Sequence, residues 1–198
     1  IEYKKYNIKI AREKAERKGV VFDEKLNPEL FNSLSTNIVM VGLNFSKDIQ
    51  FERPFMNFHD KSPHGNDFKI RYAFEGTQYY GAYMTDLIKN LAMTSSKDVL
   101  KYIKENPEVL KGQITSFREE LKFIESSKPI IIAFGNDVYK ILRKYLQKDE
   151  YASLIQITHY SHQIGKEKYR KETHEKLKIV QSHSEMFLSS EIEIKKIT

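Results

Sequence analysis

The chain has 198 residues, of which 40% are hydrophobic and 12% aromatic, and this composition excludes an intrinsically disordered chain. We expect a single domain over residues 1–198, because this length suffices for one well-buried core. The absence of Cys excludes disulfides, thiol catalysis and iron–sulfur clusters, and the net charge of +6 favours an anionic partner such as nucleic acid.

The sequence predicts no membrane segment and no signal peptide. The longest apolar run, Ile130 to Phe134, is far shorter than the ~20 residues that a membrane-spanning helix needs. The first helix-like stretch, 2–18, is charged throughout, unlike a secretory signal. We therefore expect a cytoplasmic monomer, and no feature of the sequence calls for a cofactor.

The first half of the chain alternates between helical and strand-like segments. Residues 2–18 are rich in helix formers and end at Gly19, which predicts a helix packed on the domain. A β-branched run at 37–41 predicts the first buried strand. The next 22 residues (42–63) contain aromatics and Pro without a period, which is typical of a long functional loop. Asn66 or Asp67 can cap a helix that runs through Phe74.

The second half continues the alternation, and Asn136 is expected to cap one of its helices. Strands that alternate with helices, two of them almost continuously apolar, predict a parallel sheet covered on both faces. The predicted fold class is α/β, a three-layer sandwich with about four mostly parallel strands and a core over 37–180. The expected strands are 79–85, 129–134, 153–158 and 191–197, and the expected helices are 96–105, 113–126, 138–146 and 166–180.

Polar side chains follow the predicted strands at the points where each strand ends. In open parallel sheets, ligands bind outside the carboxyl ends of the strands, so chemistry is expected at these junctions. The junctions are Gly42-Leu43-Asn44-Phe45-Ser46, Thr85-Asp86, Gly135-Asn136 and His159-Tyr160-Ser161-His162-Gln163.

Taken in chain order, these junctions resemble the uracil-DNA glycosylase superfamily over residues 37–165. That family has a Gly-x-Asn/Asp-Pro motif after its first strand and a His-Pro-Ser motif after its last core strand. The resemblance implies the α/β sandwich of that family and a hydrolase of DNA repair, which cleaves the N-glycosidic bond of a damaged or deaminated base. Here Phe45 and Tyr160 stand in place of the two motif prolines, so both loops are expected to be shaped differently.

The resemblance also implies the catalytic and base-binding residues. Asn44 matches the residue that positions the attacking water, and His159 matches the donor that stabilises the departing base anion. The extruded base would stack on an aromatic ring, for which Phe58 is the first choice and Phe55 the second. The remaining base-binding candidates are Gly42, Thr85 and Asp86.

A DNA partner would be held through its phosphate backbone and one extruded base. Ser161 would bind a backbone phosphate, and Gln163 or Ile164 occupies the position of the residue that wedges into the duplex. Three cations at the start of the last helix would then face phosphates. They are Lys166, Lys168 and Arg170.

Other interpretations of the same residues remain open. Asn44 can be a turn residue, Asp86 can cap a helical turn over 87–91, and the two Phe can be core residues. One alternative function is a catalytically weak module that binds nucleic acid or a nucleotide on the same fold. A second is a metal-dependent hydrolase. Its ligands would be His59, Asp60 and His64.

Two histidines lie in the charged C-terminal part of the chain. His174 and His183 are flanked by Lys and Glu or by polar residues, and the sequence predicts that both face solvent.

Overall fold

The computed structural model describes residues 35–44, 58, 65–89, 91 and 93–179. The predicted helix at 2–18 and the predicted strand at 191–197 lie outside these residues. The described elements are β1 (Ser35–Asn44), α3 (Phe68–Phe74), β2 (Ala82–Ile88), α4 (Ser96–Glu105), α5 (Pro107–Phe123), β3 (Ile130–Phe134), α6 (Asn136–Tyr145), β4 (Ser153–Ile157) and α7 (Lys166–Leu177).

The four described strands form one sheet in the order β2-β1-β3-β4, and every neighbouring pair is parallel. The two central strands are β1 and β3, whose runs of Ile, Val and Met are buried on both faces. Such continuously apolar strands are typical of a sheet covered by helices on both sides. The predicted α/β fold with a parallel sheet of four strands is confirmed.

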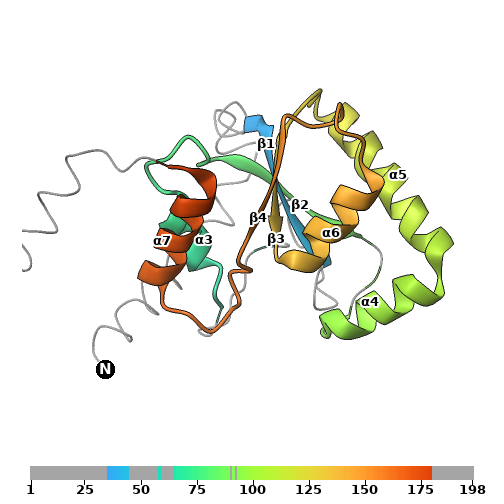
Figure 1. The fold of residues 1–198 in the computed structure, drawn as a ribbon, viewed down its shortest axis with the longest axis horizontal. Coiled ribbons are helices and arrows are strands. Elements are labelled where there is room, and N and C mark those ends of the chain that lie inside the picture. Colours follow the sequence, from blue (N-terminus) through green and yellow to red (C-terminus); the bar gives the residue numbers. More distant parts are fainter. Residues whose placement is uncertain (1–34, 45–57, 59–64, 90, 92, 180–198) are drawn as a thin grey trace, which may run out of the picture.

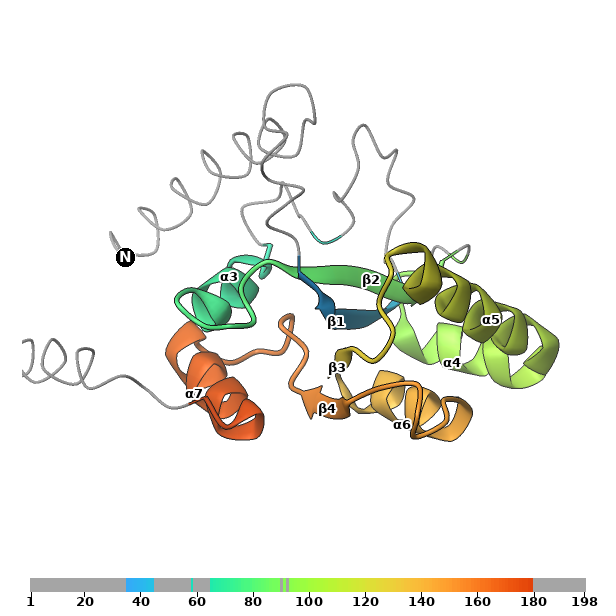
Figure 2. The same cartoon turned by 90° about the horizontal axis from the view of Figure 1, so that it is seen from above.

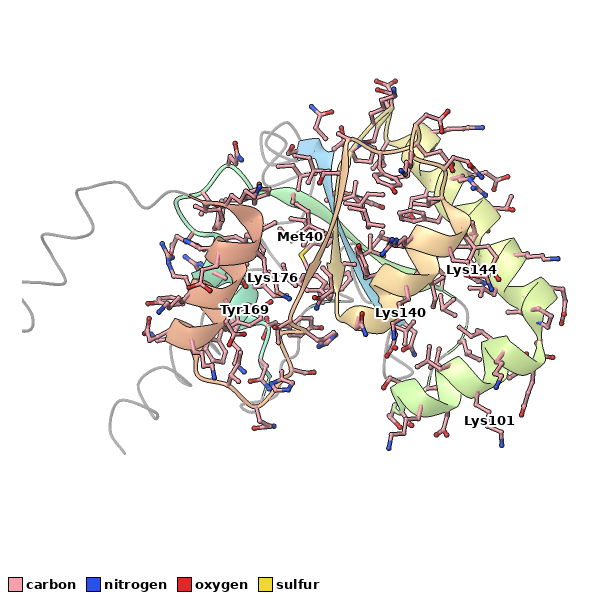
Figure 3. All side chains as sticks on the ribbon, in the orientation of Figure 1. Met40, Lys101, Lys140, Lys144, Tyr169 and Lys176 are labelled. Atoms are coloured by element: carbon pink, nitrogen blue, oxygen red, sulfur yellow. The ribbon has the colours of Figure 1, made fainter. Side chains whose placement is uncertain are left out.

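Helices cover both faces of the sheet, with α3 and α7 on one side and α4, α5 and α6 on the other (Figures 1 and 2). Successive side chains of β1 point to opposite faces of the sheet, so they pack against different layers of helices. Val39 and Val41 pack in the core under α4, α5 and α6. Met40 belongs to the second core, where it lies on the same side of the sheet as Tyr169 of α7 (Figure 3).

The bounds of most elements differ from the predicted ones by one to a few residues, and three differences have a clear physical reason or consequence. Helix α5 begins at Pro107 rather than at 113, because Pro in the first turn has no N–H to leave unpaired and its φ suits a helix. Strand β2 continues to Ile88, so Asp86 lies inside a strand and cannot cap a helical turn over 87–91. Gly135, at φ +91°, takes the cap position of α6, and the expectation that Asn136 caps it is wrong.

The prediction that His174 faces solvent is also wrong, since only 5% of the residue is exposed. Its Nε2 lies 2.7 Å from the carbonyl oxygen of Ala73, which can only accept, so Nε2 carries the proton and links α7 to α3. Because Lys and Glu make up most of α7, the sequence does not indicate that this helix has a buried side. His183 lies outside the described residues. Among the described residues, no helix is both long and apolar enough to cross a membrane.

Candidate functional site

The candidate residues gather at the carboxyl edge of the sheet. Because all four strands are parallel, Asn44 at the end of β1 and the segment that follows Ile157 of β4 reach the same edge. The connection from β1 to β2 includes α3 on one face, whereas the connection from β3 to β4 includes α6 on the other. The chain therefore leaves β1 and β3 in opposite directions, which creates the switch point where ligands bind in sheets of this type.

Three of the base-binding candidates are in direct contact. Gly42 pairs with Asp86 across β1 and β2. A Cβ atom on Gly42 would overlap the Asp86 Oδ1 and would lie 3.2 Å from Cε1 of Phe58. Asp86 and Phe58 are 5% and 7% exposed, so a carboxylate and a ring edge are held together in the interior. Only Gly at position 42 allows this approach.

Thr85, the other candidate for reading the base, lies on the opposite side of β2. Its hydroxyl donates to Glu120 Oε1 of α5 at 2.8 Å, and Lys89 Nζ donates to the Thr85 hydroxyl at 2.8 Å. Tyr83 donates to the same Glu120 carboxylate, and burial together with that carboxylate raises the pKa of Tyr83. Of the two candidates, Asp86 is therefore the one next to Gly42 and Phe58.

Asn44 is held by the segment that follows β2. Its Nδ2 donates to the carbonyl of Leu91 at 3.1 Å and to the carbonyl of Met93 at 2.9 Å. Both amide protons are used in these bonds, so the side chain has no further N–H to donate to a ligand. The amide also ties the end of β1 to the connection that leads into α4.

His159 follows β4 and leans across to the end of β3, where a Cβ on Gly135 would lie 3.9 Å from the His159 Cβ. The imidazole stacks on Tyr160 with ring centroids 4.4 Å apart, and Tyr160 meets the edge of Phe134 at 5.5 Å. Burial among these rings lowers the pKa of His159 below its ordinary value. The ring is therefore neutral near pH 7.

The hydrogen bonds of His159 determine which nitrogen carries the proton. The backbone N–H of Ser161 points at Nδ1 from 3.2 Å, and the Ser161 hydroxyl oxygen lies 2.8 Å from the same atom. Because an N–H can only donate, Nδ1 is the acceptor and the proton is on Nε2. No described residue bonds to Nε2, so this N–H can donate to a ligand at the sheet edge.

The loop that carries His159 is closed by its own backbone and by Lys69 of α3. The His162 N–H donates to the His159 carbonyl at 3.0 Å, and the Ile164 N–H donates to the His162 carbonyl at 2.7 Å. Lys69 Nζ donates to that same His162 carbonyl at 2.9 Å. The sequence reasoning missed Lys69, although Lys69 and Ala73 lie one helical turn apart on the buried side of α3, where a Lys is unusual.

Two of the three predicted phosphate-binding cations lie against Tyr72 of α3. Lys166 Nζ is 4.5 Å from the centre of the Tyr72 ring, and Arg170 lies 5.4 Å from it and donates to the Tyr72 carbonyl at 2.6 Å. Lys168 projects outward with 68% of its side chain exposed and pairs with Glu172. All three lie on α7, close to the His159 loop in the chain.

Only some of the remaining candidate residues belong to the described part of the chain. Gln163 and Ser161 are exposed, and Ile164 packs at the margin of the core under α3 and α7. The described residues contain no group of three or more His, Asp or Glu that could hold a metal ion. The candidates that lie outside the described residues are Phe55, His59, Asp60 and His64.

The described candidates comprise a neutral N–H donor on His159, after β4, and a buried carboxylate beside an aromatic ring, on β2 and at Phe58. A donor of this kind can stabilise an anionic leaving group, and the carboxylate can accept hydrogen bonds from the edge of a heterocycle. Comparisons of the chain with protein-family models, curated proteins and solved structures found no match.

Proposed function

We propose that this chain is a DNA glycosylase that hydrolyses the N-glycosidic bond of a damaged or deaminated base. The observation that carries the proposal is the neutral His159, with its proton on Nε2, at the carboxyl edge of the sheet. In this reaction the C1′–N bond breaks and its electron pair leaves with the base. The oxygen of water bonds to C1′ and loses one proton, and the departing base anion gains one, so that the products are the free base and an abasic sugar. A neutral N–H donor aimed at a base oxygen stabilises that developing negative charge.

The contact among Gly42, Asp86 and Phe58 supports a planar ligand with hydrogen-bond donors on its edge. A base extruded from a duplex presents such an edge, and its face can stack on an aromatic ring. Asn44 Oδ1 would orient the attacking water, while Ser161 and the cations of α7 would hold the DNA backbone. These roles follow the resemblance to the uracil-DNA glycosylase superfamily.

The first experiment treats a panel of labelled oligonucleotides, each with one lesion, first with the protein and then with alkali. We expect alkali-dependent strand breaks at the preferred lesion. His159→Ala should lower the single-turnover rate by about 10²-fold, the usual effect of losing such a donor, while binding to an abasic product changes much less.

His162→Ala is a matched control, because its imidazole is exposed in the same loop and only its backbone N–H and carbonyl take part in the described bonds. Its rate should stay close to that of the wild type. Equal loss of cleavage and of product binding in His159→Ala would contradict a role in the chemical step.

A second candidate function is a module that binds nucleic acid or a nucleotide on this fold without cleaving it. The observation that favours it is that the Asn44 amide donates to the carbonyls of Leu91 and Met93, so that Asn44 stabilises the end of β1. The same oligonucleotide panel separates the two functions. Tight binding without alkali-sensitive sites at any lesion would support the binding module.

A further inference from the structure

Lys69 is an almost fully buried cation at the back of the His159 loop. Only 5% of the residue is exposed, and its Nζ donates to the His162 carbonyl at 2.9 Å. No Asp or Glu of the described residues forms an ion pair with it. Among the described residues, the buried Lys69 ammonium is therefore bonded only to a backbone carbonyl.

This placement is unfavourable for folding by itself. Moving an ammonium out of water without a counter-charge costs free energy, and burial accordingly lowers the pKa of Lys69. An apolar side chain of similar volume would suit the inner face of α3 better. A costly charge of this kind, next to candidate catalytic residues, points to a role at the loop that it contacts.

The His162 carbonyl is the central acceptor of that loop. It receives the Ile164 N–H and the Lys69 ammonium, while the His162 N–H reaches back to the His159 carbonyl. The Ser161 N–H that fixes the proton of His159 lies inside this turn. A rotation of the peptide after His162 would move the Ser161–His162 backbone, and with it the donor to Nδ1.

We propose that Lys69 is a positioning residue that holds the 159–164 turn in the one arrangement in which His159 carries its proton on Nε2. The consequence for catalysis rests on the proposed glycosylase function, but the proton position does not. Without the Lys69 ammonium, the turn loses a bond to α3, the Ser161 N–H moves off Nδ1, and the imidazole populates both neutral forms.

The test is a long-range ¹⁵N–¹H NMR spectrum of the histidines near pH 7.5, with the His159 signals assigned by their loss in His159→Ala. In the wild type we expect a protonated Nε2 and an unprotonated Nδ1. In Lys69→Met, which is one bond shorter but unbranched and removes both the charge and the donor, the two nitrogen shifts should move toward each other. Lys69→Arg, which keeps both, should restore the wild-type pattern at least in part.

Lys101→Met is the matched control, since Lys101 projects from the outer side of α4 with 74% of its side chain exposed (Figure 3). It should leave the His159 signals unchanged. If Lys69→Met does not fold, Lys69→Gln, which also removes the charge but keeps a polar end, is expected to shift the signals in the same direction. A wild-type protein with the proton on Nδ1, or a folded Lys69 variant with unchanged signals, would overturn the proposal.

Measurements of kcat and KM, taken with the NMR spectra, distinguish a failure of this inference from a failure of the proposed function. If base release is found, Lys69→Met should lower kcat by about tenfold to 10²-fold with little change in KM, as expected for a displaced catalytic group. A shift in the NMR signals without any base release in the wild type would overturn the glycosylase proposal and leave the positioning role intact.

Discussion

Gly42 allows the close approach of Asp86 and Phe58, the two side chains of the proposed base-binding contact. A Cβ atom there would overlap the Asp86 carboxylate, which belongs to a neighbouring strand and cannot simply rotate away from a packed interior. We expect Gly42→Ala to lower the free energy of unfolding by about 1–3 kcal/mol, the usual cost of overpacking, and to abolish base release. Urea unfolding and the oligonucleotide assay measure the two effects.

Gly112→Ala provides the matched control for that substitution. Gly112 lies inside α5, and a Cβ there would meet nothing within 4 Å. Because Ala loses less conformational entropy in a helix than Gly, this variant should be more stable by about 0.5–1 kcal/mol. Destabilisation by both variants to the same extent would show that the contact with Asp86 is not the cause.

Asp86 should determine which base is accepted. An ionised Asp only accepts hydrogen bonds, whereas uracil presents both a donor at N3 and an acceptor at O4. We expect poor activity on plain uracil and better activity on a base with more donors, and Asp86→Asn should raise the uracil rate relative to the other lesions. Efficient excision of uracil by the wild type, or an unchanged ratio of single-turnover rates in the variant, would contradict this role.

At the scale of elements, α5 is tied to the turn before β4 by Arg118 and Glu150. Arg118 reaches the two carboxylate oxygens at 2.6 and 3.0 Å and the Tyr145 carbonyl at 2.7 Å. The hydrogen bonds from Arg118 hold the pKa of Glu150 below its usual range. This stabilisation is therefore present above the unfolded pKa of Glu, about 4.3, and is lost as the pH falls through the lower folded value.

Glu150→Gln should reduce the free energy of unfolding by about 1 kcal/mol at pH 7, a value kept small by the partial exposure of the pair. The difference from the wild type should narrow at pH 3, which urea unfolding at both pH values would show. Glu105→Gln is the control, because the Lys101–Glu105 pair is 4.0 Å long and exposed. A difference that widens at low pH would contradict the role of this ion pair.

Helix α7 is the element expected to bind DNA phosphates. Replacing Lys166, Lys168 and Arg170 with Gln should flatten the slope of log affinity against log salt by about one unit for each phosphate that the variant no longer binds. Lys168 is the most exposed of the three, so it should bind a phosphate even if the two cations on Tyr72 stay in place. An unchanged slope in the triple variant would exclude α7 from the interface.

At the scale of the whole molecule, local patterns predicted most of the described elements. The β-branched runs identified β1 and β3, and the helix expected at 96–105 has the same bounds as α4. The positions of Asn44 and His159 at one sheet edge followed from the rule for parallel strands. Boundaries were missed where packing decides them, as at β2, whose last residues Leu87 and Ile88 are fully buried.

The parts of the site that the sequence could not predict depend on contacts between distant segments. Lys69 is a cation on the short helix α3, and His174 lies on the mostly polar helix α7, so the residue types themselves do not indicate that the two are buried. Both are enclosed because α3 packs against α7, a hundred residues further along the chain. Such contacts come from tertiary packing, which residue propensities do not encode.

The order of strands in the sheet also governs how quickly the chain can fold. No two described strands form a hairpin, and the central pairing joins Ile38 to Ile130, so segments 92 residues apart in the sequence must be brought together before both edges of β1 are paired. Refolding should therefore take milliseconds to seconds, as in other domains dominated by distant contacts. Stopped-flow emission from the 12 Tyr is a suitable signal in a chain without Trp, and microsecond refolding would contradict this view.

The same order has a consequence during synthesis on the ribosome. Strand β1 emerges early, but one of its edges stays unpaired until β3 has been made. An unpaired apolar edge is a template for association with other chains. A fragment that stops before Ile130 should thus aggregate, whereas one that extends through Ile157 contains all four strands of the sheet and should aggregate far less.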